Sequence, residues 1–194
     1  MENNASLIDN AIEYIKEIFQ GKADGHGVDH TMRVYHAALD IAKHYDNKCD
    51  LELIALAALL HDVDDHKLFK TKDNANARSF LIGQRLNESR IESICNIINA
   101  VSFNKNKGKS PDTIEGKIVQ DADRLDAMGA IGIARTFAYG GKCGRDIDSS
   151  VEHFHEKLLL LKDMMNTKEA RKIAESRHRF MEQFLAELEI ETKY

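Results

Sequence analysis

Apolar positions recur along this chain at intervals of three and four residues, which is the spacing of one face of an α-helix. The first such segment runs from Leu7 to Phe19 and follows Ser6, a residue type that caps helix starts. After the glycine-rich stretch GKADGHG, a second helical face begins near Asp29. The segment 51–62 is apolar on nearly every side, so we expect a helix at the centre of a bundle.

The same period continues to the end of the chain and predicts an all-α protein. Further helices are predicted at 75–87, 90–102, 113–127, 129–138, 150–165 and 168–190. Ser89 followed by Glu92 has the pattern of a capping box at the start of one of them. The glycine-rich YGGKCGRDID segment is expected to be a loop. No segment favours a strand.

The length and composition fit a single compact helical bundle. The chain has 194 residues, of which 43% are hydrophobic and 30% charged, values that are ordinary for a globular protein. We therefore expect one domain over residues 1–194, with a functional core at about 20–140. Helices within about 150–190 are expected to pack on that core.

The charge and the terminal sequence exclude several classes of partner. A formal net charge of −5 argues against binding a nucleic-acid duplex. The N-terminal MENNASLIDN lacks the basic and apolar segments of a signal peptide, and the apolar run LIALAALL is too short to cross a bilayer. Three scattered cysteines suggest neither a disulfide framework nor a thiolate zinc site. We expect a cytoplasmic protein with no membrane partner.

Two histidines and two aspartates from three separated segments form a candidate metal site. His30 lies in GHGVDHTMRV, His61 and Asp62 lie in ALLHDVDD, and Asp123 lies in VQDADRLDAMG. Imidazole nitrogen and carboxylate oxygen suit manganese, iron, cobalt, nickel or magnesium in an open octahedral site, and suit zinc less well. Four protein ligands on a six-coordinate ion leave two positions for water and substrate, as catalysis requires.

Each candidate ligand has a polar neighbour at helical spacing. Asp65 lies four residues after His61, which would place it on the same helix face within reach of a metal-bound water. Arg33 and Asp126 each lie three residues beyond a ligand. Arg33 could bind a phosphate, and Asp126 could orient either a metal ligand or a water. Asp64 is less well aligned.

The separated H…HD…D pattern resembles the HD superfamily of metal-dependent phosphohydrolases. The similarity extends to GHGVDHTMRV, LLHDVDDHK, VSFNK, KIVQDADRLDAMGAIGIARTFAYGG and the terminal HEKLLLL…ARKIAESRHRFMEQFL. These segments resemble a bacterial subfamily of small, all-helical HD hydrolases and cover most of residues 20–190.

The resemblance implies a role for each matched residue. It makes His30, His61, Asp62 and Asp123 the metal ligands, with manganese the ion expected first. Asp65 matches the acidic position that handles protons in nucleotidase-like relatives. Together with Asp126, whose role comes from its helical spacing to Asp123, it is an expected catalytic carboxylate. Relatives with two or more ions have several additional histidines before the last aspartate, where this chain has only His66. One divalent ion is therefore expected, which weakens a cyclic-nucleotide or cyclic-dinucleotide phosphodiesterase interpretation.

Several cationic or imidazole side chains are candidates for substrate contact. They are His26, Arg33, His66, Lys105, Lys117, Arg124, Arg135 and Arg145. Two interpretations stay open for some of them. The lysine-rich loop 104–110 is either a solvated loop or a mobile lid, and Arg124 either binds phosphate or pairs with an aspartate.

The function expected from the resemblance is hydrolysis of a nucleotide-like phosphate ester or anhydride. Cleavage of a nucleoside triphosphate to monophosphate and pyrophosphate is the first choice, and 5′-nucleotidase action is the second. The competing class is a non-catalytic sensor that binds a nucleotide through the same metal pocket. The long C-terminal helix packs either internally or across a homodimer.

Overall fold

The computed structural model describes residues 6–21, 27–45, 48–101, 106 and 108–193. Within these ranges every regular element is a helix, which confirms the all-α prediction. The helices group into two compact units, residues 1–120 and 121–194, and each is described by itself. The single-domain expectation stays a prediction. No helix in the described ranges has the length and apolar character needed to span a membrane.

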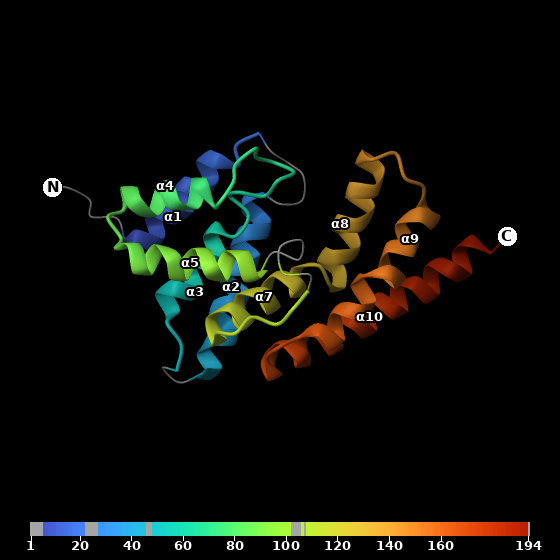
Figure 1. Ribbon diagram of the computed structural model, residues 1–194. Helices are drawn as coiled ribbons and strands as arrows, with labels where there is room; N and C mark the ends of the chain where they lie inside the picture. Colours follow the sequence, from blue (N-terminus) through green and yellow to red (C-terminus); the bar gives the residue numbers. More distant parts are fainter. Residues whose placement is uncertain (1–5, 22–26, 46–47, 102–105, 107, 194) are drawn as a thin grey trace. The chain divides into compact units, whose positions relative to one another are not determined.

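Unit 1 is built around α3. Its elements are α1 (Leu7–Ile18), α2 (Val28–Ala42), the 3-10 helix η1 (Lys43–Tyr45), α3 (Leu51–Leu60), α4 (Ala75–Gly83), α5 (Glu88–Val101) and the first part of α7 (Ile114–Asp126). Helix α3 packs against α1, α2 and α5, and every residue from Ile54 to Leu60 is buried (Figure 1). The predicted central helix is therefore confirmed.

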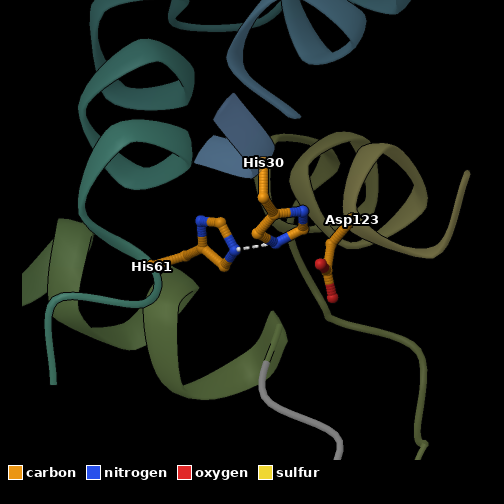
Figure 2. A group of neighbouring side chains, drawn as sticks. All are labelled: His30, His61 and Asp123. Atoms are coloured by element: carbon orange, nitrogen blue, oxygen red, sulfur yellow. Dashed lines mark hydrogen bonds between the residues drawn. The ribbon is translucent and has the colours of Figure 1, made fainter. Parts of the chain in front are cut away.

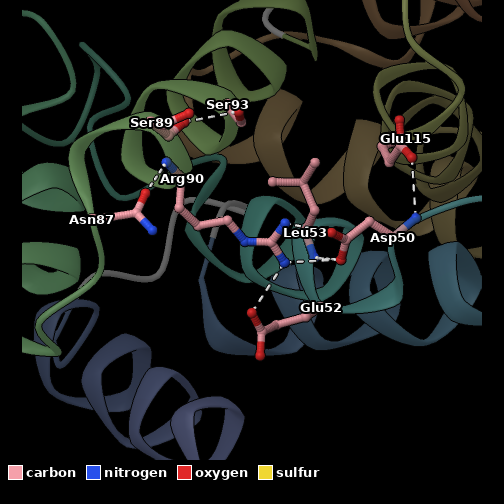
Figure 3. Close-up of polar contacts among 8 residues, drawn as sticks. All are labelled: Asp50, Glu52, Leu53, Asn87, Ser89, Arg90, Ser93 and Glu115. Carbon is pink, nitrogen blue, oxygen red and sulfur yellow. Dashed lines mark hydrogen bonds and ion pairs between the residues drawn. The ribbon is translucent and has the colours of Figure 1, made fainter.

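A polar network fixes the start of α3. The Asp50 carboxylate accepts a hydrogen bond from the Leu53 N–H at 2.9 Å, as expected of a cap. Arg90 of α5 forks onto the same carboxylate and also reaches Glu52 at 3.0 Å (Figure 3). The Asp50 N–H donates to Glu115 of α7 at 3.0 Å. These bonds tie the starts of three helices of unit 1 together, and the Arg90 hydrogen bond lowers the pKa of Asp50 to about 2.

The capping box predicted at Ser89 is wrong. Helix α5 begins at Glu88, and the side chain of Asn87 accepts a hydrogen bond from the Arg90 N–H at 2.9 Å. Ser89 lies inside the first turn, where its carbonyl accepts from the Ser93 hydroxyl (Figure 3). Asparagine is as good a helix cap as serine, and Asn87 stands two residues earlier.

Two further boundaries in unit 1 differ from the predictions. The helix predicted at 75–87 ends at Gly83, and Arg85 just beyond it adopts a left-handed backbone with φ of 61°. Helix α3 ends at Leu60 rather than at about residue 62. His61 to Asp64 therefore form a turn that follows the helix.

Unit 2 contains the end of α7 and three further helices. These are α8 (Gly129–Lys142), α9 (Ile147–Glu156) and α10 (Lys168–Thr192), with the 3-10 helix η2 (Leu158–Met164) before the last. Helix α10 packs along α8 and η2, and α9 packs on the same two elements (Figure 1). The single helix predicted at 150–165 is divided at Lys157, whose backbone is not helical.

Helix α8 is longer than the predicted 129–138 because the Gly140 and Gly141 pair continues the helix instead of opening a loop. A Cβ atom at Gly140 would lie 2.5 Å from the Ser150 hydroxyl of α9. The glycine therefore permits close packing of α8 against α9.

A buried carboxylate that the sequence did not single out ties α7 to α10. Asp121 accepts hydrogen bonds from the backbone and side chain of Asn166, both at 2.8 Å, and from the Thr167 N–H at 2.7 Å. Thr167 in turn caps α10 through the Ala170 N–H. Burial raises the pKa of Asp121, although these hydrogen bonds oppose the rise.

Candidate metal centre

Two of the predicted ligands come from helix ends in unit 1. His30 is the third residue of α2 and is only 2% exposed. His61 directly follows the last residue of α3 and is also buried. Helix α3 is apolar and buried from Ile54 to Leu60, so His61, the next residue, also lies in the interior of unit 1.

Three ligand atoms of unit 1 converge on one point. The Nε2 atoms of His30 and His61 lie 3.2 Å apart, and Asp62 Oδ2 lies 3.4 Å from each of them. Two ligands about 2.1 Å from one ion are separated by about 3.0 Å at a right angle and about 3.4 Å at the tetrahedral angle. The triangle therefore has the dimensions of three adjacent ligands of one ion.

The protonation of His61 suits a metal ligand. Its Nδ1 lies 2.8 Å from the Ala58 carbonyl oxygen, which can only accept a hydrogen bond. Nδ1 therefore carries the proton, and the lone pair of Nε2 points toward His30 and Asp62. A backbone carbonyl that orients an imidazole in this way is a common companion of metal-ligating histidines.

Asp62 presents a buried carboxylate oxygen that needs a partner. Its side chain is 13% exposed, and Oδ2 has no hydrogen-bond donor among the described residues, since the two imidazoles at 3.4 Å are too distant for well-formed bonds. Burial tends to raise the pKa of Asp62, but the adjacent His61 and His30 side chains outweigh it, so the pKa lies well below its usual range. An ionised, buried oxygen without a donor is costly, and a cation would relieve that cost.

Asp123 supplies the third segment of the cluster. It lies on α7, which begins in unit 1 and continues past the division at residue 120. One oxygen of Asp123 and one ring nitrogen each of His30 and His61 lie within 4.8 Å of one another, an arrangement that could hold a metal ion. Figure 2 shows the His61 ring pointing toward His30, with Asp123 approaching from its own helix.

Asp65 does not share a helix face with His61. It lies beyond the end of α3, and its Oδ1 accepts a hydrogen bond from the Lys67 N–H at 2.7 Å. His66 is 66% exposed at its side chain and lies 3.7 Å from the same oxygen. The argument from helical spacing is therefore wrong, because the helix ends before the spacing applies. The proton-handling role of Asp65 stays a prediction.

The carboxylate of Asp126 is paired within unit 2. It is 4% exposed and lies 2.6 Å from Arg135 of α8. The structure thus joins a predicted catalytic carboxylate to a predicted substrate contact. Arg177 of α10 also acts electrostatically on Asp126, while its own pKa is lowered mainly by burial.

The other cationic candidates have different surroundings. Arg124 is buried and donates to the Met164 carbonyl, while Asp121 and Asp123 act electrostatically on its guanidinium. Arg145 is exposed, with its guanidinium 5.8 Å from the centre of the Tyr139 ring. Arg33 on α2 and Lys117 on α7 are half-buried. His26 and Lys105 lie outside the described residues.

Asp64 is the residue beside the cluster that sequence reasoning missed. Its two carboxylate oxygens accept hydrogen bonds from the Asn76 and Ala77 N–H groups at the start of α4, each at 3.0 Å. The partners stand twelve and thirteen residues away, beyond the reach of any helical spacing rule. The one feature of the sequence that pointed to this contact was the predicted start of a helix near residue 75.

The comparisons with known proteins agree with this geometry. The HD domain family model matches residues 27–128. The chain is 41% identical over 185 residues to YpgQ, an uncharacterized protein of Bacillus subtilis (strain 168), with 91% of this chain and 89% of YpgQ covered.

Solved structures show the same similarity. The crystal structure of Bacillus subtilis YpgQ in complex with ADP matches with a TM-score of 0.79 and 37% identity, over 94% of this chain and 98% of that one. An HD-superfamily hydrolase from Bacillus thuringiensis matches with a TM-score of 0.78 and 41% identity, over 95% of each chain. The chain therefore belongs to the HD domain family, as its H…HD…D pattern predicts.

Proposed function

We propose that this protein is a phosphohydrolase that uses one divalent ion, held by His30, His61, Asp62 and Asp123, to cleave a nucleotide. The observation that carries the proposal is the convergence of two Nε2 atoms and one ionised carboxylate oxygen at 3.2–3.4 Å. The similarity to an HD-superfamily hydrolase supports hydrolysis, and the ADP complex of YpgQ supports a nucleotide ligand.

The residues of the chain account for the binding and orientation steps. When bound, a divalent ion supplies the acidity that activates a water molecule near neutral pH and the charge that neutralises phosphoryl oxygens. Ala58 holds the His61 ring through Nδ1, and Asp62 contributes negative charge at the pH of the cell because its pKa is low. Asp65 uses Oδ1 to accept from Lys67, and we assign its other oxygen to proton transfer.

We propose a single ion, with manganese first and cobalt, nickel, iron, magnesium or zinc as alternatives. Nitrogen and oxygen ligands without a thiolate favour the first group over zinc. His66, the one histidine between Asp62 and Asp123 in the sequence, turns a largely exposed side chain toward Asp65. It therefore lacks the buried setting of His30 and His61.

Within nucleotides, we propose cleavage of a triphosphate to monophosphate and pyrophosphate, with 5′-nucleotidase action as the alternative. Arg33 and Lys117 are the described cationic candidates whose side chains are half-buried on helices that also carry ligands, α2 and α7. Arg33 and Lys117 are therefore the first residues to substitute in a test of phosphate binding. All three cysteines are free, which fits the reducing cytoplasm as the place of action.

The test uses metal-stripped protein reloaded with manganese or cobalt and a panel of nucleoside tri-, di- and monophosphates. Phosphate and pyrophosphate are measured separately, so that the attacked phosphorus is identified. Release from one member that depends on the ion supports the proposal. Binding of nucleotide without release from any member, with the ion demonstrably bound, would instead favour the sensor.

A further inference from the structure

We propose that Asp64 and Asn76 are positioning residues that hold the turn carrying His61 and Asp62 in its metal-binding geometry. The inference deepens the proposed function and rests on the metal-binding role given there to the turn. All the residues that carry the argument belong to unit 1.

The first observation concerns the start of α4. Helices usually cap their first free N–H groups with the side chain of the residue at the N-cap position. Here that residue is Asn74, which makes no such bond, and its side chain instead donates to Asn99 of α5 at 3.1 Å. The N–H groups of Asn76 and Ala77 are capped by both oxygens of Asp64. The cap of α4 therefore comes from the turn formed by His61 to Asp64.

The contact is reciprocal. The Asn76 side-chain amide donates to the Val63 carbonyl oxygen at 2.7 Å, while the Asn76 N–H donates to Asp64 at 3.0 Å. The Val63–Asp64 segment of the turn is thus held by both the backbone and the side chain of Asn76. Two backbone bonds also support the turn: the Val63 N–H donates to the Leu60 carbonyl at 3.4 Å, and the Asp65 N–H donates to the Asp62 carbonyl at 3.0 Å. Among the described residues no backbone bond of this kind holds the Val63 carbonyl, so the Asn76 amide is the contact that fixes its direction.

The backbone is strained directly before the start of α4, where this contact is made. Asp73 and Asn74 are consecutive non-glycine residues in the left-handed region, with φ of 55° and 56°. Such conformations persist where surrounding bonds determine them and concentrate near functional sites. The Tyr14 hydroxyl of α1 donates to the Asn76 carbonyl at 3.2 Å and adds a further anchor. Asn76 is therefore fixed to α1 while it holds the turn.

Loss of these contacts should let the Val63–Asp64 peptide rotate, shift the turn and move the Asp62 oxygen away from the two histidines. Outer partners of metal ligands typically change metal affinity by about 10-fold to 100-fold when they are removed. Asp64→Ala should therefore weaken manganese or cobalt binding by about that factor. Asp64→Asn keeps one acceptor and should lose less, and Asn76→Ala should weaken binding while α4 keeps its Asp64 cap.

The experiment is a cobalt titration of metal-stripped full-length protein, followed by the visible absorption of the bound ion and by the thermal midpoint. The matched control is Asp146→Ala, which removes a carboxylate cap of the same kind from α9, where Asp146 accepts from the Ser149 N–H at 2.8 Å. Equal loss of thermal stability with weaker and spectrally altered cobalt binding only in the Asp64 and Asn76 variants supports the proposal.

Cobalt affinity and spectrum within about twofold of the original in folded Asp64→Ala and Asn76→Ala would overturn it, because removal of a positioning residue should cost at least about 10-fold. The readout is independent of turnover. Original protein that binds cobalt but hydrolyses nothing refutes the proposed function alone, whereas original protein that binds no ion refutes both.

Discussion

The Nε2 atoms of His30 and His61 face each other across 3.2 Å in the interior of unit 1. The bond from His61 Nδ1 to the Ala58 carbonyl makes His61 Nε2 an acceptor, and the ionised oxygen of Asp62 lies beside both rings. Two imidazole nitrogens and one carboxylate oxygen thus converge in a buried space. A divalent cation is the ligand that such a space stabilises.

Substitution of His61 should abolish metal binding without loss of the fold. His61→Ala removes a ligand and should weaken manganese binding by more than about 100-fold, beyond the loss seen for outer partners. Isothermal titration of metal-stripped protein measures the change. His36→Ala on the exposed face of α2 is the matched control and should bind manganese normally. Normal affinity in His61→Ala would remove His61 from the site.

Asp65→Asn should separate binding from turnover. The amide still accepts from the Lys67 N–H but cannot take up a proton, so metal and nucleotide affinity should remain while kcat falls by about 10²-fold to 10⁴-fold. Steady-state kinetics and nucleotide titration give the two numbers. Asp40→Asn, an exposed carboxylate paired with Lys43, is the control. Turnover retained in Asp65→Asn would assign proton transfer to another group.

Arg135 should matter more for the stability of unit 2 than for substrate binding. Arg135→Ala leaves the buried Asp126 carboxylate without its 2.6 Å partner and should cost about 1–3 kcal/mol of unfolding free energy in urea. Arg145→Ala removes an exposed contact with Tyr139 and should cost less than about 1 kcal/mol. If Arg135→Ala kept full stability but lost nucleotide affinity, the substrate-binding role predicted from the sequence would hold.

Asp50 should make unit 1 less stable in acid. Hydrogen bonding to Arg90 lowers its pKa in the folded protein to about 2 from the ordinary 3.8, so its contribution is complete above pH 4 and declines as the pH falls toward 2. Asp50→Asn removes that contribution, and the stability difference from the original protein should be larger at pH 6 than at pH 3. Urea unfolding at the two values measures it, and a difference independent of pH would contradict the ion pair.

Local patterns in the sequence predicted much of the fold. Ser6 and Asp50 cap their helices as their residue types suggest, and the uniformly apolar segment before His61 is the buried centre of unit 1. Three of the four proposed ligands also meet in unit 1 as expected. These successes share a cause, since capping, periodicity and the H…HD…D pattern are each expressed within short segments.

The misses involve partners that are distant in sequence. Asp64 caps a helix twelve residues away, and Asp121 binds residues more than forty positions later. The prediction that Asp65 shares a helix face with His61 is wrong because α3 ends at Leu60, before both residues. Tertiary contacts of this kind leave no periodic signal.

The most direct test of the metal-dependent hydrolase is the titration of metal-stripped protein with manganese while pyrophosphate release from nucleoside triphosphates is followed. At protein concentrations well above the dissociation constant, turnover should rise linearly and level off at one ion per chain. Turnover that levels off at two ions, or a filled site with no release of pyrophosphate or phosphate from any nucleotide, would contradict the account.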